Sequence, residues 1–159
     1  MENKIDLQKL KEPIQTKWRV QSAKKGKAIC IPYIDARDAQ ERLDNVCGME
    51  NWGSRHKEEK GNLFCEIGIK INGEWVWKSD VGSESNIEKN KGEASDSFKR
   101  AAVMWGVGRF LYKMDPVVLK TSNYKGKEYP YAPEHDKIIF DGTTLTRYIN
   151  WLRNGKNGK

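Results

Sequence analysis

The sequence predicts an α+β fold: a curved antiparallel sheet backed on one face by helices, with elements in the order β-β-α-β-β-β-α. Three observations predict this fold. Residues 16–23 and 63–71 alternate apolar and polar side chains, as half-buried strands do. Residues 35–47 and 92–105 repeat apolar side chains three and four positions apart, as amphipathic helices do. An Asn-Gly turn at 72–73 joins two strands tightly, which favours antiparallel pairing.

The first elements are a short helix and a strand pair. Apolar side chains spaced along residues 5–14 predict a helix that Pro13 ends. The strand over 16–23 then turns at residues 24–27 into a second, more buried strand over 28–34. This order predicts a hairpin at one end of the sheet.

The middle of the chain contains a capped helix and a second strand pair. Asp35 is the expected N-cap of a helix that runs to Cys47. Every odd-numbered residue of the strand over 63–71 is apolar, so one face of that strand is expected to be buried. The chain returns through residues 74–82, and a further helix begins near Gly92.

The region beyond Tyr112 is expected to be irregular up to a short strand over 138–140 and a last helix from about 144 to 153. The sequence therefore divides into a core, a C-terminal extension packed on that core, and a frayed tail. These three parts are residues 1–112, 113–153 and 154–159.

The charge of the chain indicates a polyanionic partner. Its formal net charge is +7, and its isoelectric point is about 9.2. Residues 97–159 carry 12 Lys and Arg against 5 Asp and Glu, and residues 16–27 carry five cations with no acid. Nucleic acid is the polyanion that such a distribution favours. Solubility alone is the other interpretation of the same charge.

The cysteines and the termini indicate a cytoplasmic protein. Cys30, Cys47 and Cys65 are odd in number, widely spaced and each in apolar company, which predicts buried thiols in a reducing compartment. The polar N-terminus has no features of a secretion signal, and no apolar run is long enough to span a membrane. We expect no membrane partner.

The residues predict neither catalysis nor a bound cofactor. The chain has no phosphate-binding GxxxxGK[ST] loop, and its two histidines, His56 and His135, lie in polar contexts without a nucleophile nearby in sequence. Acids and lysines four apart, as in Glu66 and Lys70, are explained by charge pairing on a solvated strand face. No catalytic residue, metal ligand or cofactor is therefore expected.

The helix that begins near Gly92 carries the strongest local signal. A predicted sheet-facing stripe contains Phe98, Ala101, Ala102 and Trp105. Lys99 and Arg100 lie beside this stripe. Asp96 is positioned to pair with Arg100 at i,i+4, whereas Lys99 has no acid at either i−4 or i+4. Lys99 is thus a cation available to a ligand.

Three segments, in order and correctly spaced, resemble one protein family: YIDARDAQERLDNVCGMENW (33–52), DVGSESNIE (80–88) and KGEASDSFKRAAVMWGVGRFLY (91–112). The G-x-x-x-W after the first long helix, the DVG of the hairpin and the KRA of the later helix are specific in combination. Over residues 7–112 the chain resembles the Rad52/Rad22 family of single-strand annealing proteins, and within it the short bacterial and phage DdrA-like branch. The resemblance makes residues 1–112 a single-strand annealing core.

The resemblance implies assembly into rings, or open helical arrays, with a positively charged groove around the outside. Single-stranded DNA would lie in that groove, held by its phosphates with the bases turned outward for pairing. The implied activity is ATP-independent strand annealing in homologous recombination and DNA repair. Implied partners are single-stranded DNA, further copies of the chain, and a host single-strand-binding protein or recombinase.

The candidate DNA contacts come from three places in the chain. The groove cations of the family match Lys99 and Arg100, and Arg37 is the nearest counterpart of a third. The basic hairpin supplies a second group: Lys17, Arg19, Lys24, Lys25 and Lys27. A lysine-protected sheet edge explains that hairpin equally well.

Three further interpretations remain open. Trp75 and Trp77 either stack on bases or, as is more common for Trp, belong to the core. Protection of 3′ DNA ends without annealing is an alternative function within the family. A metal-dependent, structure-specific nuclease is the alternative from another class.

Overall fold

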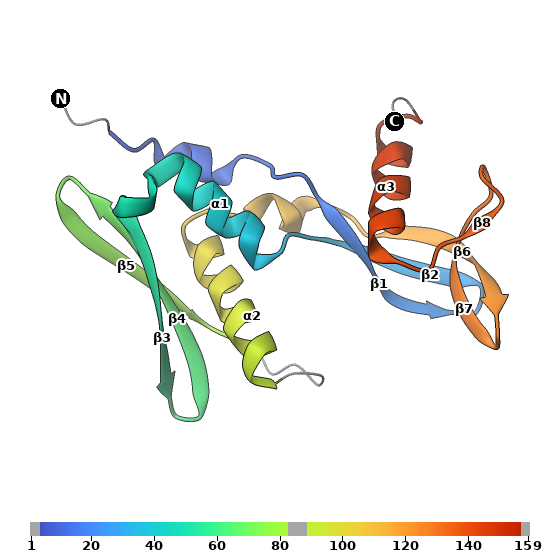
Figure 1. The fold of residues 1–159 in the computed structure, drawn as a ribbon, viewed down its shortest axis with the longest axis horizontal. Helices are drawn as coiled ribbons and strands as arrows, with labels where there is room; N and C mark the ends of the chain where they lie inside the picture. The colour runs from blue at the N-terminus through green and yellow to red at the C-terminus, as the bar shows by residue number, and fades with distance from the viewer. Residues whose placement is uncertain (1–3, 83–88, 157–159) are drawn as a thin grey trace. The chain divides into compact units, whose positions relative to one another are not determined.

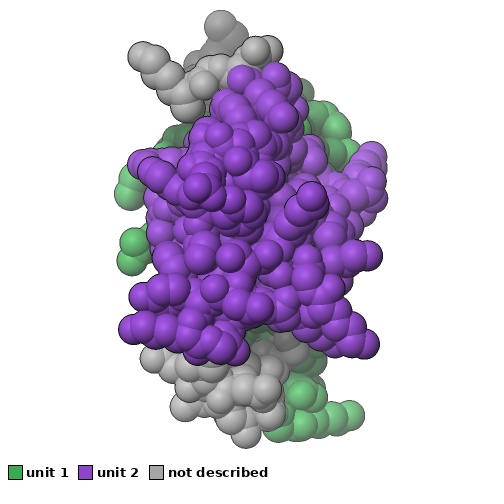
Figure 2. Space-filling model, turned by 90° about the vertical axis from the view of Figure 1, so that its right-hand side faces the viewer, with its two compact units in different colours: residues 1–14, 34–110 green, residues 15–33, 111–159 purple. Residues whose placement is uncertain are grey.

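The computed structural model describes residues 4–82 and 89–156 and has an α+β fold with antiparallel strands (Figure 1). The chain divides into two compact units, coloured differently in Figure 2. Unit 1 contains residues 1–14 and 34–110, and unit 2 contains residues 15–33 and 111–159. No helix of the described residues is long and apolar enough to cross a membrane. The predicted fold class is confirmed, although the strands form two sheets rather than one.

In unit 1 a three-stranded sheet is covered on one face by a helix. The strands β3 (Trp52–Glu59), β4 (Asn62–Ile71) and β5 (Glu74–Val81) pair in that order. Helix α2 (Lys89–Met104) packs against β4 and β5, and α1 (Ala36–Cys47) packs against α2 (Figure 1). Short 3-10 helices lie at Leu7–Lys11, Met49–Asn51 and Arg109–Lys113.

The core of unit 1 lies between this sheet and α2. Cys65, Ile67 and Ile69 alternate along β4 and are fully buried. The α2 stripe predicted from the sequence is buried as well, namely Phe98, Ala101, Ala102 and Trp105. The indole N–H of Trp105 donates a 2.9 Å hydrogen bond to the carbonyl oxygen of Ile67. The prediction of the sheet-facing stripe is therefore confirmed.

Helix α2 ends in a Schellman motif, which fixes where the helix stops. The amide of Val107 donates to the carbonyl of Ala102 and that of Gly106 to the carbonyl of Val103. Gly106 has a φ of +105°, which a residue with a Cβ adopts only with strain. The Arg109 side chain donates to two more carbonyls at this end, those of Val103 and Met104. The last turn of α2 is thus closed by backbone and side chain together.

We expect Gly106→Ala to lower the free energy of unfolding by about 1–2 kcal/mol, because Ala in the left-handed region is disfavoured by that amount. The added Cβ would also lie 2.9 Å from Cγ of Lys11. Urea denaturation followed by Trp fluorescence measures the effect. Gly142→Ala is the matched control, since nothing lies within 4 Å of its Cβ position. Equal stability of the two variants would contradict the assigned role of Gly106.

Unit 2 is a five-stranded antiparallel sheet covered by one helix (Figure 1). The strand order is β1-β2-β6-β7-β8. The strands are β1 (Lys17–Lys24), β2 (Lys27–Tyr33), β6 (Val117–Tyr124), β7 (Lys127–Ala132) and β8 (Lys137–Ile138). Helix α3 (Gly142–Arg153) packs against β1, and the indole N–H of Trp18 donates to Oδ1 of Asn150 on this helix.

The core of unit 2 joins residues distant in sequence. Trp18, Cys30 and Ile149 are fully buried there.

Cys30, like Cys47 and Cys65 in unit 1, is a free thiol, as expected from the sequence. Burial raises the pKa of each of the three thiols to about 11. All three therefore remain protonated, and poor nucleophiles, at neutral pH.

Several predicted elements differ from the structure. The expected helix over 5–14 is only the 3-10 helix Leu7–Lys11, and α2 begins at Lys89 rather than near Gly92. The region beyond Tyr112 is not irregular, because 117–132 form the hairpin β6–β7. The strand expected over 138–140 is the short β8, which ends at Ile138.

The expected division at residue 112 falls close to the end of unit 1 at Phe110, but the first two strands belong to unit 2. Residues 15–33 pair with β6, which the expected scheme placed in the C-terminal extension. As a functional division, the 1–112, 113–153 and 154–159 scheme stays a prediction. Residues 157–159 of the expected tail lie outside the described residues, as do residues 83–88 of the second family motif.

Candidate nucleic-acid interface

Lys99 and Arg100 lie on α2, beside the buried stripe that holds this helix on the sheet. The Lys99 side chain is half-buried, and that of Arg100 is exposed. Nε of Arg100 lies 3.0 Å from Oδ2 of Asp96, as the i,i+4 spacing predicts. Within the described part of the chain, no carboxylate pairs with Lys99. Both cations project from a helix whose position is fixed by packing.

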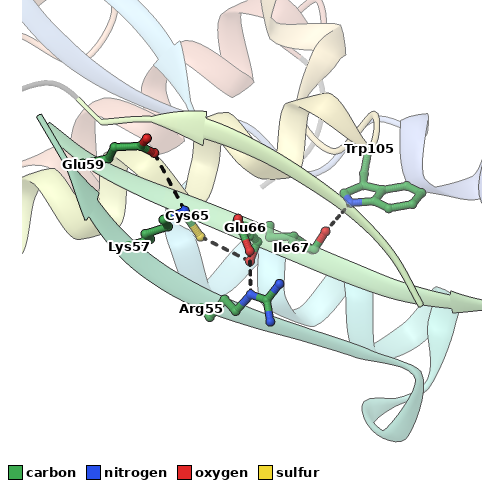
Figure 3. A network of polar contacts seen from close by, with 7 residues as sticks. All are labelled: Arg55, Lys57, Glu59, Cys65, Glu66, Ile67 and Trp105. Atoms are coloured by element: carbon green, nitrogen blue, oxygen red, sulfur yellow. Dashed lines mark hydrogen bonds and ion pairs between the residues drawn. The ribbon is translucent and has the colours of Figure 1, made fainter.

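Two polar anchors flank this pair of cations along α2. Towards the start of the helix, the buried Glu93 accepts a 3.0 Å hydrogen bond from the amide of Leu63 on β4. Towards its end, Trp105 donates to Ile67 on the same strand (Figure 3). Because α2 is tied to β4 on both sides of Lys99, the stems of the two cations are held while their charged ends reach solvent.

Arg37 lies in the first turn of α1 and is exposed. The N-cap Asp35 and Asp38 form a capping box there, with 2.9 Å hydrogen bonds in both directions. A cation in the first helical turn is disfavoured by the helix dipole, so nothing in the fold itself calls for an arginine at this position. Arg37 shares unit 1 with Lys99 and Arg100, on the helix that packs against theirs.

In unit 2 the strand register gathers the basic hairpin onto one face of the sheet. Directly opposite residues in antiparallel strands share a face, and Lys17 pairs with Tyr33, Arg19 with Ile31 and Lys24 with Lys27. Lys27 in turn pairs with Lys120 on β6. This face is the one opposite α3, because Trp18, Ala28 and Cys30 point into the core.

The sheet face opposite α3 is therefore basic. We call it the basic face of unit 2, and its cations are Lys17, Arg19, Lys24, Lys27, Lys120 and Lys127. None of the strand residues of β1, β2, β6 and β7 that share this face is acidic. Of the five hairpin cations predicted from the sequence, Lys25 is the exception, because it lies in the turn itself with a φ of +53°.

Aromatic side chains accompany the cations of the basic face. The guanidinium of Arg19 lies 5.7 Å from the ring centre of Tyr33, and Nζ of Lys127 lies 5.3 Å from that of Tyr129. Tyr129 and Tyr124 both meet the exposed ring of Phe140 edge-on. A surface that mixes cations with aromatic rings suits a chain of phosphates and bases.

The turn of the basic hairpin is held by a carboxylate on β7. Glu128 accepts hydrogen bonds of 2.7 Å from the hydroxyl of Thr121 and from the amide of Gly26. These two bonds lower the pKa of Glu128, so its carboxylate stays charged and the hairpin end stays attached to β6 and β7. The basic hairpin is part of a sheet and not a free loop.

Sequence reasoning missed Lys120 and Lys127, which the structure adds to the predicted set. Their signal was present: the turn Lys-Gly-Lys at 125–127 repeats the Lys-Gly-Lys at 25–27, within a region rich in cations. It also missed the exposure of Trp75 and Trp77, which are 45% and 38% exposed on β5. The expectation that these two residues belong to the core is wrong, because they lie on the sheet face opposite α2.

No site of another kind emerges from the described residues. Across residues 4–82 and 89–156, no three His, Cys, Asp or Glu side chains lie together where they could hold a metal ion. Glu66, which the sequence assigns to charge pairing on a strand face, forms an ion pair of 2.5 Å with Arg55 across β3 and β4 (Figure 3). The surfaces described above are basic and aromatic.

Comparisons with known proteins agree with this chemistry. A sequence model of the Rad52/22 family double-strand break repair protein matches residues 3–130, a range that includes every predicted DNA contact. The chain is 32% identical over 95 residues to the single-stranded DNA-binding protein DdrA of Deinococcus radiodurans, and 33% identical over 92 residues to that of Deinococcus deserti. These alignments cover 58% and 57% of this chain and 45% of each relative. The chain thus spans about half the length of the curated relatives it matches.

Proposed function

The chain belongs to the Rad52/22 family of double-strand break repair proteins, and on that premise we propose that it binds single-stranded DNA through the phosphates and anneals complementary strands. Annealing requires that the base edges stay accessible, and cations that hold the backbone meet this requirement. The observation that carries the proposal is the pair Lys99 and Arg100, fixed on α2 between two polar anchors and beside solvent. The relatives are single-stranded DNA-binding proteins by name, which supports single-stranded DNA as the ligand.

The proposed reaction involves no covalent step. Two strands meet because the protein neutralises their phosphates, which removes most of the repulsion between them. Base pairing then supplies the driving force, so no nucleotide is hydrolysed and no cofactor is needed. We also propose that the chain acts as a homo-oligomer in the cytoplasm, where its buried thiols stay reduced. A host single-strand-binding protein or recombinase is a further proposed partner.

Incubation with two complementary labelled oligonucleotides in EDTA tests the proposal. We expect duplex formation to be accelerated over the protein-free rate, and size-exclusion chromatography with light scattering to give a mass well above 18.3 kDa. Binding of single strands without acceleration would instead support protection of 3′ ends. Shortening of the oligonucleotides only when magnesium is added would support the nuclease. Either result contradicts annealing.

A further inference from the structure

The sheet face of unit 1 opposite α2 carries two exposed tryptophans. Trp75 and Trp77 alternate along β5, and their rings stack with centroids 5.8 Å apart and planes 24° apart. Of the six tryptophans in the chain these two are the exposed ones, since Trp18 and Trp105 are buried and Trp52 and Trp151 are half-buried. Large exposed aromatic side chains that lie together usually mark a binding surface.

Each of the two indoles has a cation beside it. Cζ of Arg55, on β3, lies 4.0 Å from the ring centre of Trp77, and its guanidinium is held there by the ion pair with Glu66 (Figure 3). Lys70, on β4, is exposed and directly opposite Trp75. The Arg55 guanidinium and the two indoles thus form a contiguous group of planar side chains, with a second cation on the strand opposite Trp75.

Two glycines shape the surface around this stack. Trp77 lies flat on Gly68, where a Cβ would come within 2.7 Å of the indole. Gly53 on β3 is the cross-strand partner of Gly68, and nothing lies within 4 Å of its Cβ position. The space above Gly53, beside the Gly68 on which Trp77 lies, is therefore unoccupied and could admit a flat ligand.

We propose that this face, the tryptophan platform of Trp75, Trp77, Arg55 and Lys70, binds unpaired nucleobases by stacking. The proposal rests on the proposed function and adds a contact to bases beside the contacts to phosphates. Planar bases extend the existing stack of rings and guanidinium, and the adjacent cations suit the phosphates that connect them. Stacking of this kind does not depend on sequence, because every base has a π-face.

A second copy of the chain is a less suitable occupant. The two half-exposed indoles offer roughly 100 Å² each, scaled from the ~250 Å² of a large aromatic side chain. A stable dimer buries about 800 Å² on each partner. Charged residues on β3 and β4, among them Arg55, Glu66 and Lys70, lie next to the indoles and interrupt the apolar area on this face.

The platform and the α2 cations lie on opposite sides of the β3–β4–β5 sheet. Cys65, Ile67 and Ile69 face α2, while Glu66, Gly68 and Lys70 face the platform. One short strand of DNA cannot contact both surfaces through the sheet. The platform therefore holds a separate segment of unpaired DNA, which suits a protein that must bring two strands together.

The test compares two ligands that share phosphates but not bases: oligo-dT and an abasic oligomer of the same length. We expect wild-type protein to bind oligo-dT roughly fivefold to a hundredfold more tightly. In Trp75→Ala/Trp77→Ala this preference should largely disappear while the affinity for the abasic oligomer is retained. Trp75→Phe/Trp77→Phe, which keeps an aromatic face at both positions, should retain most of the preference.

The outcomes separate the platform from the proposed function. Equal binding of both oligomers by wild-type protein, or an unchanged preference in the double Ala variant, overturns the platform. The double Ala variant could also form a smaller assembly in sedimentation and still prefer oligo-dT over the abasic oligomer. That result would show that the tryptophans contact another copy of the chain, and it too would overturn the platform. Wild-type protein that binds neither oligomer at low salt overturns the proposed function itself. If removal of Trp77, which lies on Gly68, disturbs the fold, the same comparison is made with Trp75→Ala alone, which should reduce the preference for oligo-dT.

Discussion

Reversal of both α2 cations, Lys99→Glu with Arg100→Glu, is expected to weaken binding of single-stranded DNA by roughly a hundredfold or more. Hydrogen bonds to charged groups contribute about 1.5–3 kcal/mol each, and a reversed charge adds repulsion to that loss. The effect should be equal for all base sequences, because phosphates carry no sequence information. The slope of log K against log salt should also become shallower by about 0.7 for each phosphate that the variant no longer binds. Fluorescence anisotropy at several salt concentrations measures both quantities.

Controls for this variant must separate local contact from net charge. Lys137→Glu with Arg147→Glu changes the net charge by the same amount at exposed positions that belong to no proposed DNA contact, and should weaken binding far less. The fold should survive reversal of the α2 pair, because the ion pair of Arg100 with Asp96 is exposed and contributes little to stability. If the two double variants weaken binding equally, the α2 cations do not form a site.

The local elements of unit 1 could be predicted because their signals are local. The capping box at Asp35, the Asn-Gly turn at 72–73 and the alternation along β4 each fix the backbone within a few residues. The two-residue turn also fixes the register of β4 and β5, and thereby places Trp77 opposite Gly68 and on the face away from α2. The sequence therefore implied that Trp75 and Trp77 are exposed. The expectation was wrong because it followed the general tendency of Trp to be buried.

The sheet of unit 2 could not be predicted in the same way. The pairing of Lys27 with Lys120 joins residues 93 positions apart, and no local pattern encodes such a pairing. The hairpin β6–β7 was missed because its turn, Lys125-Gly126, has a lysine at a φ of +50°, where Asn or Asp is the usual signal. The same Lys-Gly geometry recurs at Lys25-Gly26, so this chain makes its basic turns in one way.

The α2 cations were predictable for a different reason. Packing of α2 on the sheet follows from a stripe of apolar residues, and whatever lies beside the stripe must face solvent. The basic face of unit 2 instead depends on strand pairing, so the sequence supplied the cations of the first hairpin without Lys120 and Lys127 beside them. A surface assembled from distant strands becomes visible only when the register is known.

The pair Lys27 and Lys120 gives the second large expected effect. Like charges directly opposite in a sheet destabilise it, and each charge-reversed pair recovers about 0.2–1 kcal/mol. Lys120→Glu should therefore raise the free energy of unfolding while it weakens DNA binding. The double variant Lys27→Glu/Lys120→Glu restores like charges and should weaken binding further, by about tenfold to a hundredfold in total.

Because Lys120→Glu is expected to raise the free energy of unfolding and to weaken DNA binding, a loss of binding cannot be attributed to loss of the fold. A variant that is more stable than wild type, yet binds DNA more weakly, has kept its structure and is missing only a cation that bound phosphate. Urea denaturation and fluorescence anisotropy on the same sample of Lys120→Glu measure the two quantities. Lys137→Glu with Arg147→Glu matches the charge change of the double variant at exposed positions outside the basic face, and should leave binding nearly unchanged. Unaltered binding by Lys27→Glu/Lys120→Glu would contradict a role of the basic face in DNA binding. We expect weaker DNA binding because the chain keeps a pair of lysines that repel each other inside the sheet. Lysines protect a sheet from pairing with other chains when they lie on an edge strand. β2 and β6 are not edge strands, so binding of phosphates explains this pair better.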